Sequence, residues 1–139
     1  MHARLAAKPR CVGAARRLTH TTLQSWGLAT LGDVAVLLVS ELTTNAILHA
    51  HSTVGIQLQT NPTGVRVDIC DDSPVPPQLR RYTPEAATGR GVRLLQSLAD
   101  TWGVQQSPVG GKCVWFTLVR GGQPEIVEWE FDVSTFEAL

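Results

Sequence analysis

Hydrophobic and polar positions along the chain recur with two different periods, and these divide it into helices and strands. Residues 33–50, DVAVLLVSELTTNAILHA, are mostly apolar and follow the helical period, with Asp33 as a suitable N-cap. Residues 11–26 show an amphipathic helical pattern that Gly27 ends. Because only residues 28–32 separate the two predicted helices, we expect them to pack antiparallel.

After residue 51 the period changes to two, which is typical of half-buried strands. Residues 54–59 and 65–70 alternate around a turn at 61–64, so we expect a β-hairpin. The later predictions are a helix with its apolar face over 92–99 and strands at 102–106 and 112–119. Two segments stay open: 1–9 as an edge strand or an arm, and 121–139 as an edge strand or a segment packed over the sheet.

This order of elements predicts an α+β fold. Helices and mostly antiparallel strands in separate runs favour a two-layer sandwich, in which a mostly antiparallel mixed sheet carries about three helices on one face. The length of 139 residues suits a single domain over 1–139. We expect its core at about 3–120, with 121–139 as a C-terminal extension.

Composition and charge exclude several classes of protein. Apolar residues make up 43% of the chain and charged residues 17%, which is globular composition. Twelve basic and twelve acidic residues give no net charge, so the basic footprint of a nucleic-acid-binding protein is absent. Because no apolar run approaches the roughly 20 residues of a membrane span, we expect no membrane partner and a cytoplasmic location. Cys11, Cys70 and Cys113 are scattered without metal-ligand spacing, and we expect them to be reduced thiols.

Two polar residues interrupt the apolar side of the predicted helix at 33–50. Glu41 and Asn45 lie one turn apart, and the helical period places both in the middle of the apolar stripe. An ionised carboxylate in a core costs several kcal/mol unless a partner compensates it. A hydrated Mg²⁺ suits an amide oxygen beside a carboxylate, and the carboxylate could also act as a general base. The alternative is that nearby backbone satisfies both side chains. The other members of the predicted stripe are Val34, Leu37, Leu38, Leu42, Leu48 and His49.

Two later stretches add polar candidates. Asp71 ends a core strand, where its carboxylate could accept a hydrogen bond from the exocyclic amine of a purine. On residue types alone, turn formation by Asp-Asp-Ser-Pro at 71–74 is the simpler interpretation. Gly89-Arg90-Gly91 opens a helix, where backbone N–H groups and the helix dipole favour an anion, although an ordinary hinge explains it equally well. The proline-rich loop at 73–88 is of a length that is more often functional than idle.

Together and in this order, these motifs resemble those of the GHKL ATPase family. ELTTNAILHA resembles its N-box, DICDDSPVP its G1 box and GRGVRLL its G2 box. GGKCVWFTL resembles the final strand of the small actinobacterial members related to anti-sigma-factor serine/threonine kinases. The resemblance covers about residues 3–120 and implies the Bergerat ATP-binding fold, with ATP and Mg²⁺ as ligands.

The resemblance also implies roles for individual residues. Glu41 would be the catalytic base, Asn45 would coordinate Mg²⁺ within the nucleotide site, and Asp71 would contact adenine. The family pattern D-x-G-x-G has glycines where Ser73 and Val75 stand here, and the bulk of Val75 is expected to weaken ATP binding. The remaining nucleotide-binding residues that the resemblance implies are Ser73, Gly89, Arg90, Gly91 and Val92.

Three functions follow as hypotheses. The resemblance implies a serine/threonine protein kinase of the anti-sigma type, which transfers the γ-phosphate of ATP to an anti-anti-sigma (STAS-type) protein, also holds a sigma factor and can form a homodimer. The altered G1 box favours a second hypothesis, in which a catalytically weak or inactive, nucleotide-responsive module acts by partner capture. The third hypothesis is a scaffold that binds no nucleotide. The sequence names neither the sigma factor nor the antagonist.

Overall fold

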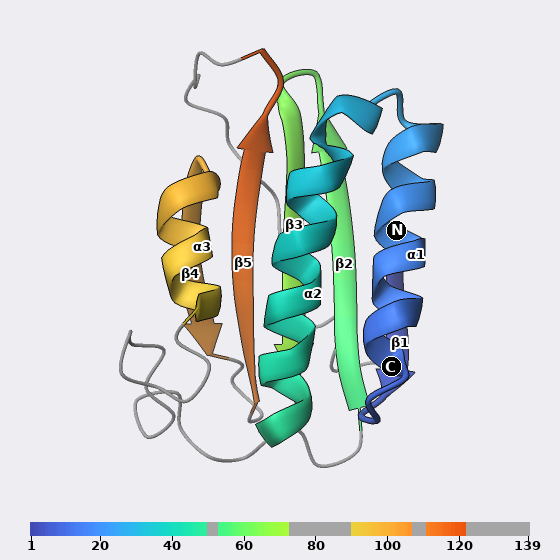
Figure 1. Ribbon diagram of the computed structural model, residues 1–139, viewed down its shortest axis with the longest axis vertical. Helices are drawn as coiled ribbons and strands as arrows, with labels where there is room; N and C mark the ends of the chain where they lie inside the picture. The colour runs from blue at the N-terminus through green and yellow to red at the C-terminus, as the bar shows by residue number, and fades with distance from the viewer. Residues whose placement is uncertain (50–52, 73–89, 107–110, 122–139) are drawn as a thin grey trace.

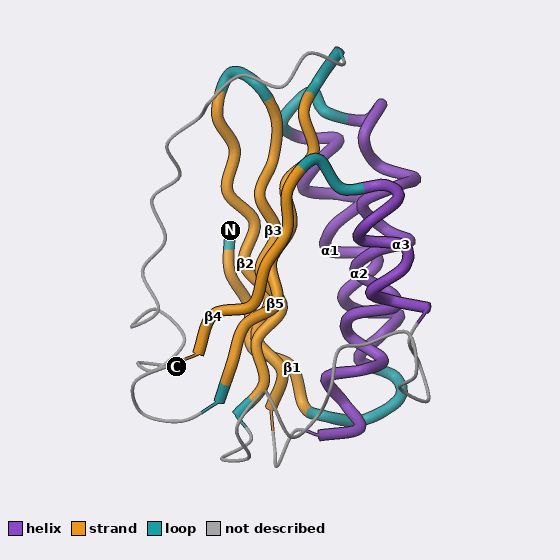
Figure 2. Tube along the Cα trace, turned by 90° about the vertical axis from the view of Figure 1, so that its left-hand side faces the viewer, coloured by secondary structure: helices purple, strands orange, loops and turns teal. Residues whose placement is uncertain are grey.

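The structure, a computed structural model, describes residues 1–49, 53–72, 90–106 and 111–121. Its described part has two layers, a five-stranded sheet and a helical layer that covers one face of it (Figure 1; Figure 2). In chain order the elements are β1 (His2–Ala6), α1 (Cys11–Ser25), the 3-10 helix η1 (Ala29–Leu31), α2 (Gly32–His49), β2 (Thr53–Asn61), β3 (Gly64–Asp71), α3 (Arg90–Leu98), β4 (Thr101–Gln106) and β5 (Lys112–Val119).

The sheet has the strand order β1-β2-β3-β5-β4, and all of its pairs among the described residues are antiparallel. The predicted hairpin is confirmed, with Asn61 and Gly64 as the last pair before the turn. The Asn61 side chain closes this turn, because its Oδ1 accepts hydrogen bonds from the backbone N–H of Thr63 at 2.8 Å and of Gly64 at 3.1 Å. The predicted α+β sandwich with helices on one face is therefore confirmed.

The structure distinguishes between the two alternatives for residues 1–9. The first residues form an edge strand, since β1 pairs with β2 from His2 opposite Gln57 to Ala6 opposite Thr53. Residues 122–139 lie outside the described residues, so the two alternatives for the C-terminal extension stay as they were. The helices α1 and α2 run antiparallel, as the short connector predicted (Figure 1).

The buried side of α2 differs in phase from the prediction by roughly a quarter of a turn. Leu37 is 41% exposed and Leu48 is 61% exposed, although both belong to the predicted stripe. Small residues were undervalued in that prediction, because alanines mark where a helix approaches a sheet most closely. Asn45 remains buried, whereas Glu41 lies half-buried at the margin of the stripe rather than in its middle. The apolar residues of α2 that form the core are Ala35, Leu38, Val39, Leu42 and Ala46.

The segment Ala29–Leu48 is long and apolar enough, by length and composition, to cross a membrane. The prediction that no run of the chain reaches this threshold was therefore wrong. The segment nevertheless includes α2, which packs on the sheet and against both α1 and α3. Its apolar character is explained by the core that it helps to form.

The cysteine prediction was also wrong. Cys70 and Cys113 form a disulfide across β3 and β5, and Cys11 is free and buried. The two bonded residues are 43 positions apart in sequence and meet because the strand register places them directly opposite each other. The spacing of the cysteines along the sequence does not reveal that register. Burial raises the pKa of the Cys11 thiol above its ordinary value.

Candidate nucleotide-binding site

The elements α2, β3 and α3, which carry predicted site residues, have termini toward one end of the sheet. At this end β3 finishes with Asp71 and β5 starts with Lys112, and the two residues are directly opposite each other. The last turn of α2 and the first turn of α3 lie toward the same end (Figure 1). The ends of four elements that are separate in the sequence therefore lie toward a single region of the fold.

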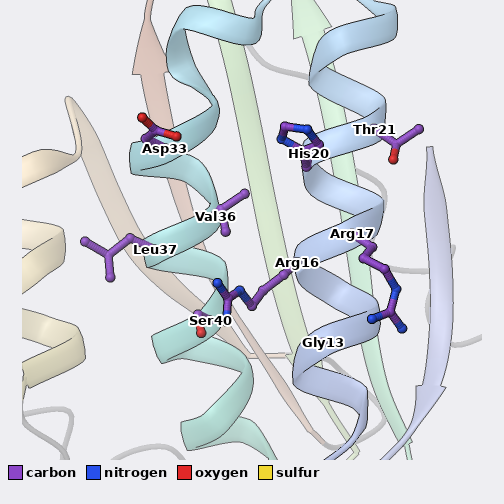
Figure 3. A pocket seen from close by; sticks show the side chains of 9 residues that line it. All are labelled: Gly13, Arg16, Arg17, His20, Thr21, Asp33, Val36, Leu37 and Ser40. Atoms are coloured by element: carbon purple, nitrogen blue, oxygen red, sulfur yellow. The ribbon is translucent and has the colours of Figure 1, made fainter.

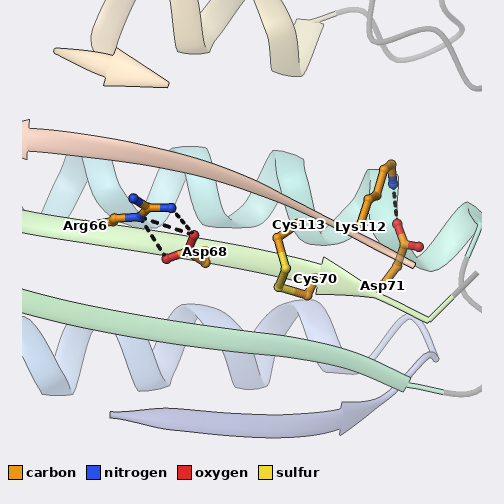
Figure 4. The surroundings of a disulfide bond; sticks show 6 residues. All are labelled: Arg66, Asp68, Cys70, Asp71, Lys112 and Cys113. Carbon is orange, nitrogen blue, oxygen red and sulfur yellow. Dashed lines mark hydrogen bonds and ion pairs between the residues drawn. A yellow bond between two sulfur atoms is a disulfide. The ribbon is translucent and has the colours of Figure 1, made fainter. Parts of the chain in front are cut away.

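Asp71 and Lys112 form a buried ion pair at this end. The Lys112 Nζ donates to Asp71 Oδ2 (Figure 4), and the two side chains are only 1% and 2% exposed, respectively. Two charges of this kind are tolerated in a core because each compensates the other, whereas either one alone would be strongly unfavourable. A carboxylate is thus held in place on the side of the sheet that faces the helices.

Gly111 lets the chain make this pairing. Its φ is +81°, and a Cβ built on it would lie 2.3 Å from the carbonyl oxygen of Asp71. Only glycine combines that backbone conformation with so close an approach. The glycine before Lys112 therefore allows β5 to begin directly against the end of β3.

The neighbouring Asp72 has a different role. Its Oδ2 accepts a hydrogen bond from the backbone N–H of Thr53 at 3.2 Å, which ties the end of β3 to the start of β2. Asp71 follows the alternation of Ile69 and points toward the helices, whereas the Asp72 carboxylate binds the start of β2. The predicted turn at 71–74 stays a prediction, because residues 73 and 74 lie outside the described residues.

Glu41 and Asn45 lie on the side of α2 that faces away from α1. Figure 3 shows Leu37 pointing away from α1, and Glu41 follows it by one helical turn. Asn45, one turn further, is 5% exposed. Because α2 packs against α1 and α3, this side is the one directed toward α3. The roles predicted for the amide and the carboxylate stay predictions.

This donor set fits a magnesium ion that shares its coordination with phosphates and water. Among the described residues no group of three or more His, Cys, Asp or Glu could hold a metal ion alone. A single buried amide with a carboxylate one turn away is the kind of site in which Mg²⁺ keeps several waters and binds substrate phosphates. Asn45 would be the protein ligand, with Glu41 beside it.

The N-terminus of α3 has the polarity that suits an anion. The helix begins at Arg90 and has no acidic residue in its first turn, so its positive dipole end is not opposed. The side chains of Arg90, Gly91 and Val92 are not among those described. Ser73, Val75 and Gly89, with the loop at 73–88, also lie outside the described residues, and their predicted roles stay predictions.

Lys112 is the member of this site that the sequence analysis missed. A lysine at the start of the otherwise apolar strand after Gly-Gly was a visible signal. Its meaning depended on the register between β3 and β5, which places it opposite Asp71. A charged residue that is 1% exposed needs a counter-charge, and only the pairing identifies which one.

A second ion pair lies on the opposite face of the sheet. Arg66 Nη2 donates to Asp68 Oδ1 at 3.0 Å, and the Arg66 guanidinium lies 4.4 Å from the centre of the Trp115 ring. Burial raises the pKa of Asp68 to about 6, while the hydrogen bond and charge of Arg66 act in the lowering direction. Because β3 alternates its side chains, this pair cannot reach the residues on the helix side of the sheet.

A groove of about 760 Å³ lies between α1 and α2. Arg16 and His20 point from α1 toward α2 across it (Figure 3). Of the candidate site residues whose side chains are described, Glu41, Asn45 and Asp71 are not part of its lining. It is therefore separate from the site at the end of the sheet. Its lining consists of Gly13, Arg16, Arg17, His20, Thr21, Asp33, Val36, Leu37 and Ser40.

The fold and the polar residues at the end of its sheet define a nucleotide-binding domain of the two-layer α+β type. The family model for the histidine kinase-like ATPase domain matches residues 5–118. The chain belongs to this family. Membership supports an ATP-binding regulatory function, and it agrees with the GHKL resemblance of the sequence motifs.

Comparison with solved structures confirms the fold. The nucleotide-free catalytic domain of the histidine kinase ThkA matches with a TM-score of 0.53 and 12% sequence identity. The match covers 86% of this chain and 97% of that domain, so almost the whole of the other fold has a counterpart here. Comparison with curated proteins finds no significant match.

Proposed function

We propose that this protein binds Mg-ATP at the β3 end of its sheet and acts as a serine/threonine protein kinase of the anti-sigma type. Its substrate would be a serine or threonine on an anti-anti-sigma protein of the STAS type, and a sigma factor would be its other partner. Transfer of the phosphoryl group would decide which partner is held. The family match and the motif order support this proposal.

The observation that carries the proposal is the buried Asp71–Lys112 pair, beside the helix face that bears Asn45. Lys112 would orient the Asp71 carboxylate so that Oδ1 accepts a hydrogen bond from the adenine amine. Asn45 would hold the magnesium ion, and backbone N–H groups at the start of α3 would hold phosphate oxygens. A purine amine and a phosphate chain need these two kinds of partner at opposite ends of one site.

Bound Mg-ATP would supply the activated phosphoryl group. Glu41 would accept the proton of the partner's hydroxyl group, whose oxygen then forms the new bond to phosphorus as ADP leaves. Its half-buried position on α2 leaves the carboxylate partly accessible, as a general base that meets a protein substrate must be. Most of the remaining rate enhancement in phosphoryl transfer comes from positioning and charge stabilisation.

A transfer assay with γ-labelled ATP, Mg²⁺ and a STAS-type partner tests the kinase proposal. We expect label on a serine or threonine of the partner, and we expect Glu41→Gln to slow the transfer by about 10²–10⁴ while nucleotide binding persists. Asp33→Asn is the matched control, because Asp33 is an exposed carboxylate in the first turn of the same helix. Transfer at the wild-type rate by Glu41→Gln would remove Glu41 from the role of base.

The sequence of the G1 box supports a second candidate. Ser73 and Val75 replace the glycines of the family pattern, which favours a protein that binds nucleotide and captures a partner without transferring phosphate. In the same assay this candidate predicts nucleotide binding, nucleotide-dependent capture of the partner and no labelled product. Both candidates place the protein in the cytoplasm, and both allow a homodimer.

A further inference from the structure

Two links of different chemistry join β3 to β5 at neighbouring positions. Cys70 is directly opposite Cys113, and Asp71 is directly opposite Lys112. The first pair is joined by a disulfide and the second by a buried ion pair (Figure 4). On both strands, the disulfide is therefore next to the ion pair that holds the Asp71 carboxylate of the proposed nucleotide site.

We propose that Cys70 and Cys113 are a redox-active pair whose oxidation state sets the affinity of the Asp71 site for adenine nucleotides, an inference that rests on the nucleotide-binding function proposed above. The disulfide form is the high-affinity form. Reduction weakens binding without unfolding the chain.

The coupling follows from the spacing of the two pairs. Bonded sulfur atoms are about 2 Å apart, whereas unbonded atoms of this size sit at about 3.5–4 Å. Reduction therefore drives the two cysteine side chains apart by roughly 1.5 Å. The Asp71–Lys112 pair is one residue further along both strands, about 3.4 Å away, so it shares the peptide units that must move.

The Asp71–Lys112 pair is poorly able to absorb such a movement. Both side chains are almost fully buried, so water cannot replace a lengthened ion pair. The backbone at Gly111 adds a second constraint, because a Cβ added there would lie 2.3 Å from the Asp71 carbonyl oxygen. A shift at the cysteines therefore changes where the Asp71 carboxylate points.

The cysteines and the carboxylate face opposite sides of the sheet. Cys70 alternates with Ile69, and Cys113 alternates with Val114, and these apolar neighbours belong to the core under the helices. Asp71 is on the helix side. A nucleotide bound on the helix side therefore does not block attack on the sulfur atoms from the other face.

The chemical step is thiol–disulfide exchange with an external dithiol. One thiolate of the dithiol attacks one sulfur of the Cys70–Cys113 bond and releases the other cysteine as a thiolate. The second thiolate of the dithiol then attacks the dithiol sulfur of the mixed disulfide and releases the remaining cysteine. Two electrons and two protons pass to the protein, which gains two thiols, while the dithiol becomes a cyclic disulfide. Exposed fractions of 5% for Cys70 and 2% for Cys113 make the exchange slow, so equilibration takes hours.

The test measures Mg-ADP binding by calorimetry on the full chain, after equilibration in reduced or oxidised dithiothreitol. Alkylation and mass measurement establish the thiol state of each sample. We expect the oxidised protein to bind at least about fivefold more tightly, within the range usual for coupling between two sites. The double variant C70S/C113S should bind like the reduced protein and ignore the redox state. Cys11→Ser is the matched control and should keep the full response, because Cys11 is the free cysteine on α1.

A second readout uses the wild-type chain alone. Linkage requires that Mg-ADP make the disulfide harder to reduce by the same factor, so a fivefold effect lowers the midpoint potential by about 20 mV. Far-ultraviolet circular dichroism of the reduced protein should match that of the oxidised protein.

Each contrary result has a definite meaning. Equal Mg-ADP affinities in the two redox states overturn the inference and leave the nucleotide site intact, as does an unchanged midpoint potential. A response that persists in C70S/C113S assigns the effect to another group and also overturns it. A reduced chain that unfolds shows that the disulfide only stabilises the fold. Absence of binding in both states overturns the proposed function itself.

Discussion

The substitution Asp71→Asn separates the structural role of the buried ion pair from its role in binding. It removes one charge and leaves the Lys112 ammonium, whose side chain is 1% exposed, without its counter-ion. Breaking a buried pair by removing one partner costs about 3–5 kcal/mol of unfolding free energy. Domains of this size have about 5–15 kcal/mol in total, so the variant should be folded but visibly weakened.

The double variant D71N/K112M provides the matched control for this prediction. Replacing both members of a buried pair by uncharged groups of similar size is often close to neutral. We therefore expect the double variant to recover most of the stability that D71N loses. Nucleotide affinity should stay low in both variants, because neither carries the carboxylate that would accept the adenine amine.

Urea denaturation gives the stabilities, and calorimetric titration with ADP gives the affinities. A loss of less than about 1 kcal/mol in D71N would show that Lys112 does not depend on Asp71 for its counter-charge. If K112M fails to restore stability, the cost lies elsewhere than in the unpaired ammonium. Wild-type affinity in either variant would remove Asp71 from the adenine contact, whatever the stability measurements show.

Three further substitutions test other parts of the structure. Asn45→Ala should weaken Mg-ATP binding in titrations far more than binding of ATP without magnesium, and equal losses would make Asn45 structural. Asp68 has a pKa of about 6 in the folded state against an ordinary 3.8, so its protonated form favours folding. This contribution to the free energy of unfolding, about 3 kcal/mol, is complete below about pH 4 and is lost as the pH rises to 6. Asp68→Asn should remove that loss from urea-denaturation profiles taken across this range, and an unchanged profile would contradict the raised pKa. Gly64→Ala should lower the melting temperature, at a cost of about 3 kcal/mol, because its Cβ would lie 2.0 Å from the Leu118 carbonyl oxygen. Gly32→Ala is its control, with nothing within 4 Å of the added Cβ, and an equal loss there would rule out the steric explanation.

The strands could be predicted from the sequence because their physics is local. In β2, Val54, Ile56 and Leu58 alternate with less buried or smaller residues, and the Asn61 turn chemistry fixes where the hairpin reverses. The strand β5 has the bounds that its apolar pattern predicted. The helix-facing positions of these strands are apolar, which makes the period of two visible in the sequence.

The phase of α2 could not be read with the same certainty. Its surface contacts the sheet, α1 and α3, so apolar residues occur around most of its circumference. The pattern predicted that Leu37 and Leu48 are in the core, whereas the smaller Ala35 and Ala46 are buried there instead. The choice depends on which neighbours cover which side, and that information is tertiary.

In the candidate site, too, local patterns could be predicted from the sequence and tertiary contacts could not. Glu41, Asn45 and Asp71 were found from their motifs, because a polar residue in an apolar element stands out along the sequence. The role of Lys112 and the Cys70–Cys113 bond were missed, because both depend on the pairing of β3 with β5. Lys112 is 41 positions from Asp71, and the two cysteines are 43 positions apart. Contacts of that kind are set by register, which a single sequence does not display.

The central claim is that this chain binds Mg-ATP at the end of the sheet where Asp71 and Lys112 meet. Calorimetric titration of the wild-type protein and of D71N/K112M with Mg-ATP, accompanied by thermal melts, tests it most directly. We predict saturable binding by the wild type and a rise in its melting temperature, with about 2.7 kcal/mol of added stability at 100 times Kd. The double variant should show neither effect. A wild-type protein that gives no binding heat and no shift in melting temperature would contradict the claim.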